Sequence, residues 1–168
     1  NVQKLSEIDN NALQIENTDP QEILKESLSL IQDYIKKENI KLNLNLSDTP
    51  INVKGGDFLL DAFENILINA VKHNKKEKKH IWINISKIKD KGNEYIKVEF
   101  KDNGIGFPDK SLDIFNGEYN SKNSSGMGIG LRLVKAIIKA YKGRIWVEDR
   151  VEGDYTQGSN FIILLRPS

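Results

Sequence analysis

Cysteine is missing from this 168-residue chain, and histidine occurs only twice. Without cysteine the protein can form no disulfide and can use no thiolate chemistry. The two histidines, His73 and His80, lack the HExxH spacing of a helical zinc site, so we do not expect a zinc centre. The absence of cysteine fits a protein of a reducing cytoplasm, and we expect this segment to be cytoplasmic.

An excess of one charge is also absent, because 25 Lys and Arg are balanced by 24 Asp and Glu for a net charge of +1. The overall charge is too small to attract nucleic acid or an anionic membrane, so any anion must be recognised by a local group of residues. No apolar run approaches the ~20 residues that span a bilayer, and the N-terminus lacks a signal-peptide pattern. We expect no nucleic-acid partner and no direct membrane contact by this segment.

Apolar residues spaced three and four apart predict helices, and alternating apolar and polar residues predict strands. The expected helices cover residues 19–37, 57–74 and 128–143. The expected strands lie near residues 12–16, 40–46, 51–53, 80–88, 94–102, 144–150 and 159–166. Asp19 and Asp57 are expected as N-caps, and residues 90–93 as the turn of a hairpin. Helices grouped with mainly antiparallel strands indicate one α+β domain, a two-layer sandwich.

Residues 103–126 are rich in Gly, Asn, Ser and Lys, with only Leu112, Ile114 and Phe115 as an apolar island. We expect a long loop here, with room for one helical turn. Loops of this length inside a compact domain are usually functional or disordered.

Four polar residues, Asn65, Asn69, Lys72 and His73, fall on one narrow face of the helix expected over 57–74, because residues advance by about 100° each. This face borders the apolar side. Asparagine is a mediocre helix former, so two of them one turn apart suggest a ligand site. An amide oxygen suits Mg²⁺ that already holds phosphates. An ordinary amphipathic helix is the alternative interpretation.

The sequence DNGIG, residues 102–106, ends an expected strand. Asp102 is expected near the core, where a carboxylate needs hydrogen-bond donors, and the exocyclic amine of adenine is such a donor. Gly104 and Gly106 would allow the backbone to approach a flat base. The same residues also form a common turn, which is the alternative interpretation.

A second glycine cluster, SSGMGIGL, precedes the helix expected from residue 128. Gly126, Gly128 and Gly130 would expose backbone amides at the positive end of that helix, which favours phosphate binding. No apolar strand precedes the cluster and no GxxxxGK[ST] loop exists, so it is neither a dinucleotide fingerprint nor a P-loop. A flexible linker is the alternative.

In order and spacing, these motifs resemble those of the sensor histidine kinase catalytic domain over nearly the whole chain. ENILINAVKHN resembles the asparagine box, DNGIG and GMGIGL the two glycine boxes, and IFNGEYN a reduced phenylalanine box. KGRIWVED and GSNFIILLRP match the final strands of the family. The resemblance implies the ATPase fold of histidine kinases, with about five strands in a mixed, mainly antiparallel sheet that three helices cover on one face.

The resemblance also implies roles for individual residues and the cofactors ATP and Mg²⁺. Asn69 would ligate Mg²⁺ with Asn65 beside it, Lys72 would meet the phosphates, and Asp102 would bind the adenine amine. The three glycines of the second box would form the hinge of an ATP lid at about residues 107–125. The implied catalytic residues are Asn65, Asn69 and Lys72, and the implied ATP-binding residues are Asn65, Asn69, Lys72, His73, Asp102, Gly104, Gly106, Lys122, Gly126, Gly128, Gly130, Leu131 and Ser159.

Two departures from the family pattern are visible. The lid is short and lacks the arginine often found after its aromatic residue, so Lys122 is the nearest cation. The phosphoacceptor histidine of the family sits on a separate helical hairpin, and neither His73 nor His80 has that context. Residues 1–11 resemble the last turns of this hairpin, with a frayed terminus as the alternative, and residues 12–168 form the expected catalytic domain.

The implied function is transfer of the γ-phosphoryl group of ATP to a histidine on the dimerisation hairpin of a parent kinase, with a response regulator as an indirect partner. A hydrolysing ATPase of the same superfamily is disfavoured, because Asn65 takes the place of its water-polarising Glu and Glu64 is rotated by about 100°. A nucleotide-sensing module without catalysis and a serine-directed kinase remain as alternatives.

Overall fold

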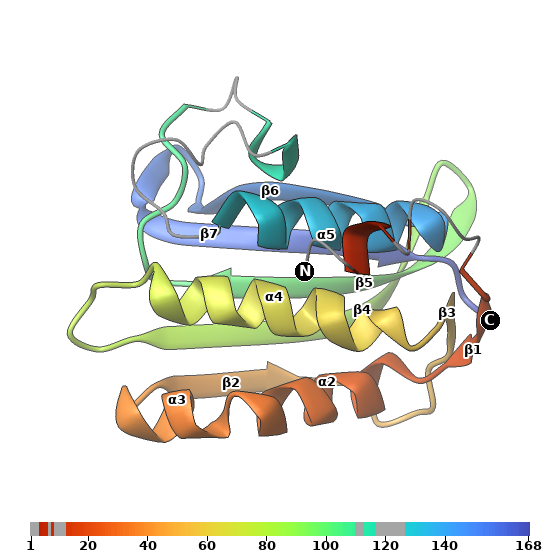
Figure 1. The fold of residues 1–168 in the computed structure, drawn as a ribbon, viewed down its shortest axis with the longest axis horizontal. Helices are drawn as coiled ribbons and strands as arrows, with labels where there is room; N and C mark the ends of the chain where they lie inside the picture. The colour runs from red at the N-terminus through yellow and green to blue at the C-terminus, as the bar shows by residue number, and fades with distance from the viewer. Residues whose placement is uncertain (1–3, 7, 9–12, 110–112, 117–126) are drawn as a thin grey trace.

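A five-stranded sheet with helices packed on one face forms the framework of the computed structural model (Figure 1). The structure describes residues 4–6, 8, 13–109, 113–116 and 127–168. The strands are β2 (Lys41–Asn45), β4 (His80–Asp90), β5 (Asn93–Asp102), β7 (Asp154–Leu165) and β6 (Arg144–Val151), in this order across the sheet. Only β2 and β4 pair in parallel. The predicted α+β sandwich with a mixed, mainly antiparallel sheet is confirmed.

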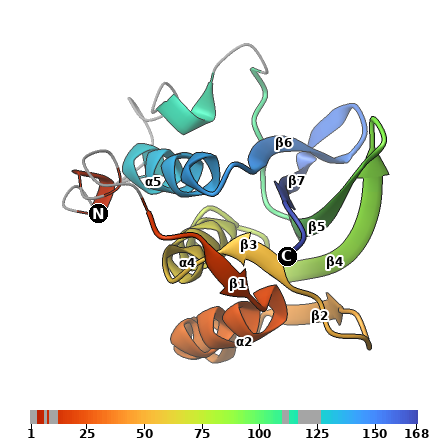
Figure 2. The ribbon, with the colours of Figure 1, turned by 90° about the vertical axis from the view of Figure 1, so that its right-hand side faces the viewer.

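Three longer helices cover one face of the sheet, and none of the described helices lies on the opposite face (Figure 2). They are α2 (Pro20–Leu30), α4 (Phe58–Lys72) and α5 (Met127–Ala140). The helix α4 lies between the other two and contacts both. Its apolar side is buried against the sheet, as the edge-to-face contact of Phe63 with Phe100 of β5 shows. In the described part of the chain, no helix is long and apolar enough to cross a membrane.

The expected first helix is divided in the structure. Helix α2 ends at Leu30, and the short helix α3 (Gln32–Lys37) begins after Ile31, whose backbone (φ −104°, ψ 14°) leaves the helical range. The buried Ile31 side chain anchors this break in the core. At the other end the predicted cap is confirmed, because the Asp19 carboxylate accepts from the N–H groups of Gln21 and Glu22.

The predicted side-chain cap of α4 is wrong. Asp57 has helical backbone angles, and its side chain accepts no capping hydrogen bond. The Tyr141 hydroxyl, at the end of α5, accepts from the Phe58 N–H at 3.2 Å instead. A side chain 83 positions away in the sequence therefore caps the N-terminus of α4 in place of Asp57.

The strands lie near the predicted positions with shifted ends, and β4 and β5 alternate between buried and partly exposed residues as expected, whereas β7 is buried throughout residues 158–165. The short strands lie at β1 (Glu16–Thr18) and β3 (Val53–Gly55), which pair with each other in a separate two-stranded sheet. The hairpin of β4 and β5 turns at Lys91 and Gly92, whose positive φ values are typical of a two-residue hairpin loop. In the loop after β5, the helical turn is η1 (Ile114–Asn116). The predicted boundary at residue 11 lies outside the described residues.

Candidate functional site

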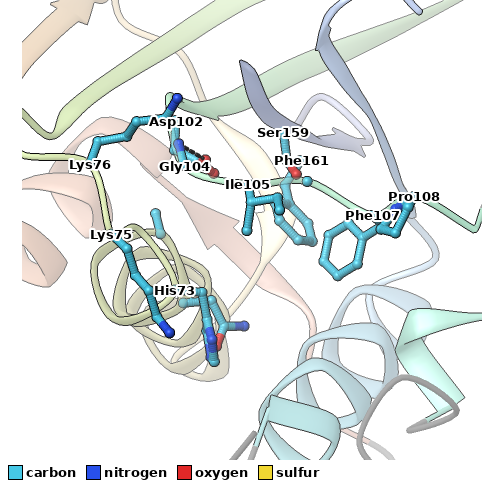
Figure 3. A pocket seen from close by; sticks show the side chains of 13 residues that line it. His73, Lys75, Lys76, Asp102, Gly104, Ile105, Phe107, Pro108, Ser159 and Phe161 are labelled. Atoms are coloured by element: carbon cyan, nitrogen blue, oxygen red, sulfur yellow. Dashed lines mark hydrogen bonds between the residues drawn. The ribbon is translucent and has the colours of Figure 1, made fainter. Parts of the chain in front are cut away.

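A cavity of about 670 Å³ opens between the C-terminal end of α4, the loop after β5 and the strand β7 (Figure 3). Six residues that the sequence singled out line it: Asn69, His73, Asp102, Gly104, Gly106 and Ser159. They come from three separate stretches of the chain, and the fold brings them together. The other lining residues are Ala70, Lys75, Lys76, Ile105, Phe107, Pro108 and Phe161.

The carboxylate of Asp102 is the most unusual charged group in the cavity. Asp102 ends β5 and is only 6% exposed, and its Oδ1 accepts from the Gly104 N–H at 2.9 Å. Burial raises the pKa of Asp102 to about 6, although the N–H groups of Gly104 and Ser159 and the charge of Arg150 lower it. Asp102 is therefore ionised at neutral pH, and as a pure acceptor it can bind an N–H donor of a ligand.

Two glycines allow the backbone to fold closely around Asp102. A Cβ at Gly106 would lie 3.0 Å from the Ser159 Oγ and from the Tyr155 carbonyl oxygen, which accepts from the Gly106 N–H at 2.7 Å. Gly158 has φ +108°, and a Cβ there would overlap the Asp102 carbonyl oxygen. The loop after β5 and the start of β7 can approach each other only because both positions lack a side chain.

The end of α4 forms the opposite wall of the cavity. Asn69 is half-buried, and its Nδ2 is buried without a hydrogen-bond partner in the described part of the chain. Burial and the charges of Lys72 and Lys75 lower the pKa of His73, which favours the neutral ring. His73 lies across the cavity from Asp102 (Figure 3). A buried donor without a partner is unusual, so packing within the described residues does not account for the Asn69 side chain.

Several predicted residues lie outside the cavity lining. Lys72 is exposed at the last turn of α4, and Leu131 is fully buried in the hydrophobic core. Asn65 donates to the Asp61 carbonyl oxygen at 2.7 Å, and a Cβ at Gly130 would lie 3.0 Å from its Oδ1, so α4 and α5 meet closely here. Gly128 falls in the first turn of α5. Lys122, Gly126 and most of the predicted lid lie outside the described residues.

The basic and aromatic parts of the cavity wall were not predicted from the sequence. Lys75 and Lys76 line the cavity, although a lysine-rich run in a loop normally indicates a solvated surface. Phe161 is contacted edge-to-face by Phe107 and by Phe115 of η1, at centroid distances of 6.1 and 6.2 Å. Phe161 begins the continuous apolar run 161–165 of β7, which is buried throughout and so does not indicate one face of the sheet, and its aromatic partners are distant in sequence.

A dedicated metal cage is absent from the described residues, which contain no group of three His, Cys, Asp or Glu that could hold an ion. Asn69 offers a neutral amide oxygen at the cavity wall. This donor fits Mg²⁺ that enters with bound phosphates, since Mg²⁺ in such sites uses few protein ligands and keeps phosphate oxygens and waters.

Comparisons with known proteins agree on one family. The family model "Histidine kinase-, DNA gyrase B-, and HSP90-like ATPase" matches residues 55–168. Cyanobacterial phytochrome A of Nostoc sp. is 29% identical over 150 residues, which are 87% of this chain and 19% of the relative. Adaptive-response sensory kinase SasA of Synechocystis sp. is 29% identical over 145 residues, 83% of this chain and 36% of the relative. The chain thus spans about a fifth to a third of these relatives.

Solved structures share the fold. The mycobacterial sensor histidine kinase MprB superposes with a TM-score of 0.75 at 24% identity, over 92% of this chain and 100% of that chain. The catalytic domain of histidine kinase ThkA gives a TM-score of 0.76 at 20% identity, over 92% and 96% of the two chains. The predicted resemblance to the sensor histidine kinase catalytic domain is confirmed.

Proposed function

The chain belongs to the family of histidine kinase-, DNA gyrase B- and HSP90-like ATPases, and we propose that it works as the catalytic and ATP-binding domain of a two-component sensor histidine kinase. The observation that carries this proposal is the buried, ionised Asp102 in a cavity of about 670 Å³, opposite the asparagine face of α4. A cavity of this size accommodates a nucleotide.

In this proposal Asp102 recognises adenine. Its carboxylate accepts from the exocyclic amine of the base, and the turn at Gly104 and Gly106 leaves room for a flat ring. Ile105 is 60% exposed at the same turn and offers apolar area to the base. The carboxylate also selects against guanine, which presents a carbonyl oxygen where adenine presents the amine, and two acceptors repel.

The phosphates extend toward α4 and α5 in this proposal. Asn69 would hold Mg²⁺ through its amide oxygen, and the bound ion would neutralise phosphate charge during transfer. Lys72, exposed at the end of α4, can reach toward the same phosphates. One turn before Asn69, Asn65 donates to the Asp61 carbonyl oxygen and offers no carboxylate to activate water. This arrangement favours transfer to an acceptor over hydrolysis.

The acceptor in this proposal is a histidine on a separate helical hairpin, from which a response regulator then receives the phosphoryl group. Neither of the two histidines of this chain is the acceptor in this proposal. His73 forms part of the cavity wall, and His80 is hydrogen-bonded to Asn43 and stacked on Trp82. The similarity to sensory kinases supports the hairpin as partner.

Calorimetric titration with ADP and GDP tests the binding step. We expect saturable ADP binding and at least about tenfold weaker GDP binding, because one charge-assisted hydrogen bond is replaced by repulsion. Asp102→Ala should abolish this preference, whereas Asp90→Ala, at an exposed ion pair with Arg144, should preserve it. Equal affinity of the unmodified protein for both nucleotides would refute the role of Asp102, and absence of ADP binding would refute the proposed function.

A further inference from the structure

Arg150, near the end of β6, contacts the backbone of Asp102, which lines the cavity. The pairing of β6 with β7 shifts register between Asp149 and Val151, so Arg150 sits at an irregularity of the sheet. Bulges of this kind redirect a side chain at the edge of a sheet. Arg150 is half-buried and does not line the cavity.

The Arg150 side chain joins two backbone segments at the point where they cross. Its Nε donates to the Asp102 carbonyl oxygen at 3.1 Å and to the Gln157 carbonyl oxygen at 2.8 Å. The segment after Gln157 passes so close to Asp102 that only glycine fits at 158. One donor thus holds both the end of β5 and the approaching strand β7.

An aromatic stack fixes the guanidinium from the other side. The guanidinium carbon of Arg150 lies 4.8 Å from the centroid of the Trp82 ring, which stacks on His80 at 3.7 Å. His80 is in turn hydrogen-bonded to Asn43 of β2. Cation–π contact and stacking restrict the rotamers of Arg150, so its hydrogen bonds act on Asp102 from a rigid base.

We propose that Arg150 is a positioning residue that holds Asp102 in the orientation for adenine recognition without itself touching the nucleotide. This inference rests on the proposed function. No motif of the sequence indicated this role. The reason is that Arg150 of β6 contacts the backbone carbonyl of Asp102 at the end of β5, and this contact depends on the fold.

The charge of Arg150 lowers the pKa of Asp102, and further basic side chains line the cavity. His73, Lys75 and Lys76 line the same cavity from α4 and the loop after it. Burial raises the pKa of Asp102, and the charge of Arg150 is among the influences that lower it. Loss of that charge should therefore raise the pKa of Asp102 further and shift ADP binding to higher pH.

The test compares Arg150→Met with the control Arg144→Met on the same strand. Arg144 is also cationic, lies over an aromatic ring and forms an ion pair, but its partners Tyr95 and Asp90 are at the far end of the hairpin. We expect Arg150→Met to weaken ADP binding about tenfold at pH 7, which corresponds to loss of a hydrogen bond. The pH midpoint of ADP binding and the carboxyl titration of Asp102, followed by carbon NMR, should both move upward. Arg144→Met should change neither.

Arg150→Lys serves as a second variant, since it keeps the charge and loses the planar donor. We expect it to retain the pH midpoint and to lose part of the affinity. If the unmodified protein and Arg150→Met have the same ADP affinity and the same Asp102 titration, or if only the free energy of unfolding changes, the proposal is overturned. Absence of ADP binding by the unmodified protein refutes the proposed function instead, and the Asp102 titration still decides whether Arg150 acts on Asp102.

Discussion

At the residue scale, the burial of Asp102 creates a conflict between ligand binding and stability. The folded-state pKa of about 6 lies above the ordinary value of 3.8. A raised carboxyl pKa stabilises the folded state fully below pH 3.8, and this contribution is lost as the pH rises through 6. At neutral pH the protein therefore keeps a buried charge at a cost in folding free energy, as ligand-binding sites commonly do.

Asp102→Asn should accordingly be more stable than the unmodified protein at high pH. The amide oxygen can still accept from Gly104, and the charge is gone. We expect a gain in the free energy of unfolding on the order of 2 kcal/mol at pH 8 that shrinks toward pH 4. Urea denaturation at both pH values measures it, with the exposed Asp90→Asn as control. A variant less stable at pH 8 would contradict this assignment.

Replacement of Asn69 tests the proposed metal ligand separately from the proposed base recognition. Asn69→Ala removes the amide oxygen and leaves the base side of the cavity intact. We expect its affinity for Mg-ATP to fall about tenfold while its affinity for metal-free ATP changes little. Asp102→Ala should weaken both forms alike. Calorimetric titrations with and without Mg²⁺ compare the variants, and equal losses for Asn69→Ala in the two conditions would exclude a metal ligand at this position.

At the scale of elements, the strand β7 contributes to the cavity wall because its first half lies in close contact with the end of β5. Gly158→Ala places a methyl group on the Asp102 carbonyl oxygen, whereas Gly153→Ala, also at positive φ, meets no atom within 4 Å. We expect Gly153→Ala to cost about 1–2 kcal/mol from backbone strain alone. Gly158→Ala should cost more and also abolish ADP binding. Denaturation and ADP titration distinguish them, and equal effects of the two variants would disprove the close approach.

The sequence predicted most of these elements, because each half-buried strand and amphipathic helix repeats its pattern over several residues. The β4–β5 hairpin and α4 are examples. The break at Ile31 and the capping of α4 by Tyr141 were missed, since they depend on tertiary contacts. The same distinction applies to the site. Asp102 and Asn69 belong to local motifs and were predicted, whereas Arg150 and Lys76 come close to the site only through tertiary contacts and were missed.

At the scale of the whole molecule, all three longer helices lie on one face of the sheet, and the cavity proposed for the nucleotide opens beside the end of α4. A transferred phosphoryl group needs an acceptor about 3 Å away and in line with the leaving oxygen. His80 is fixed by Trp82 and Asn43, and His73 lies in the cavity wall. In the proposed function the acceptor imidazole therefore comes from a separate helical hairpin.

Incubation with γ-labelled ATP and Mg²⁺, with and without the histidine-bearing hairpin of the parent kinase, shows whether the phosphoryl group is transferred to an external histidine. We expect acid-labile, base-stable label on the hairpin and none on this chain, with little release of free phosphate when the hairpin is omitted. Replacement of the hairpin histidine by Ala should abolish the label. Robust label on this chain alone, or failure to label a folded, matched hairpin under conditions where ADP binds, would contradict the account.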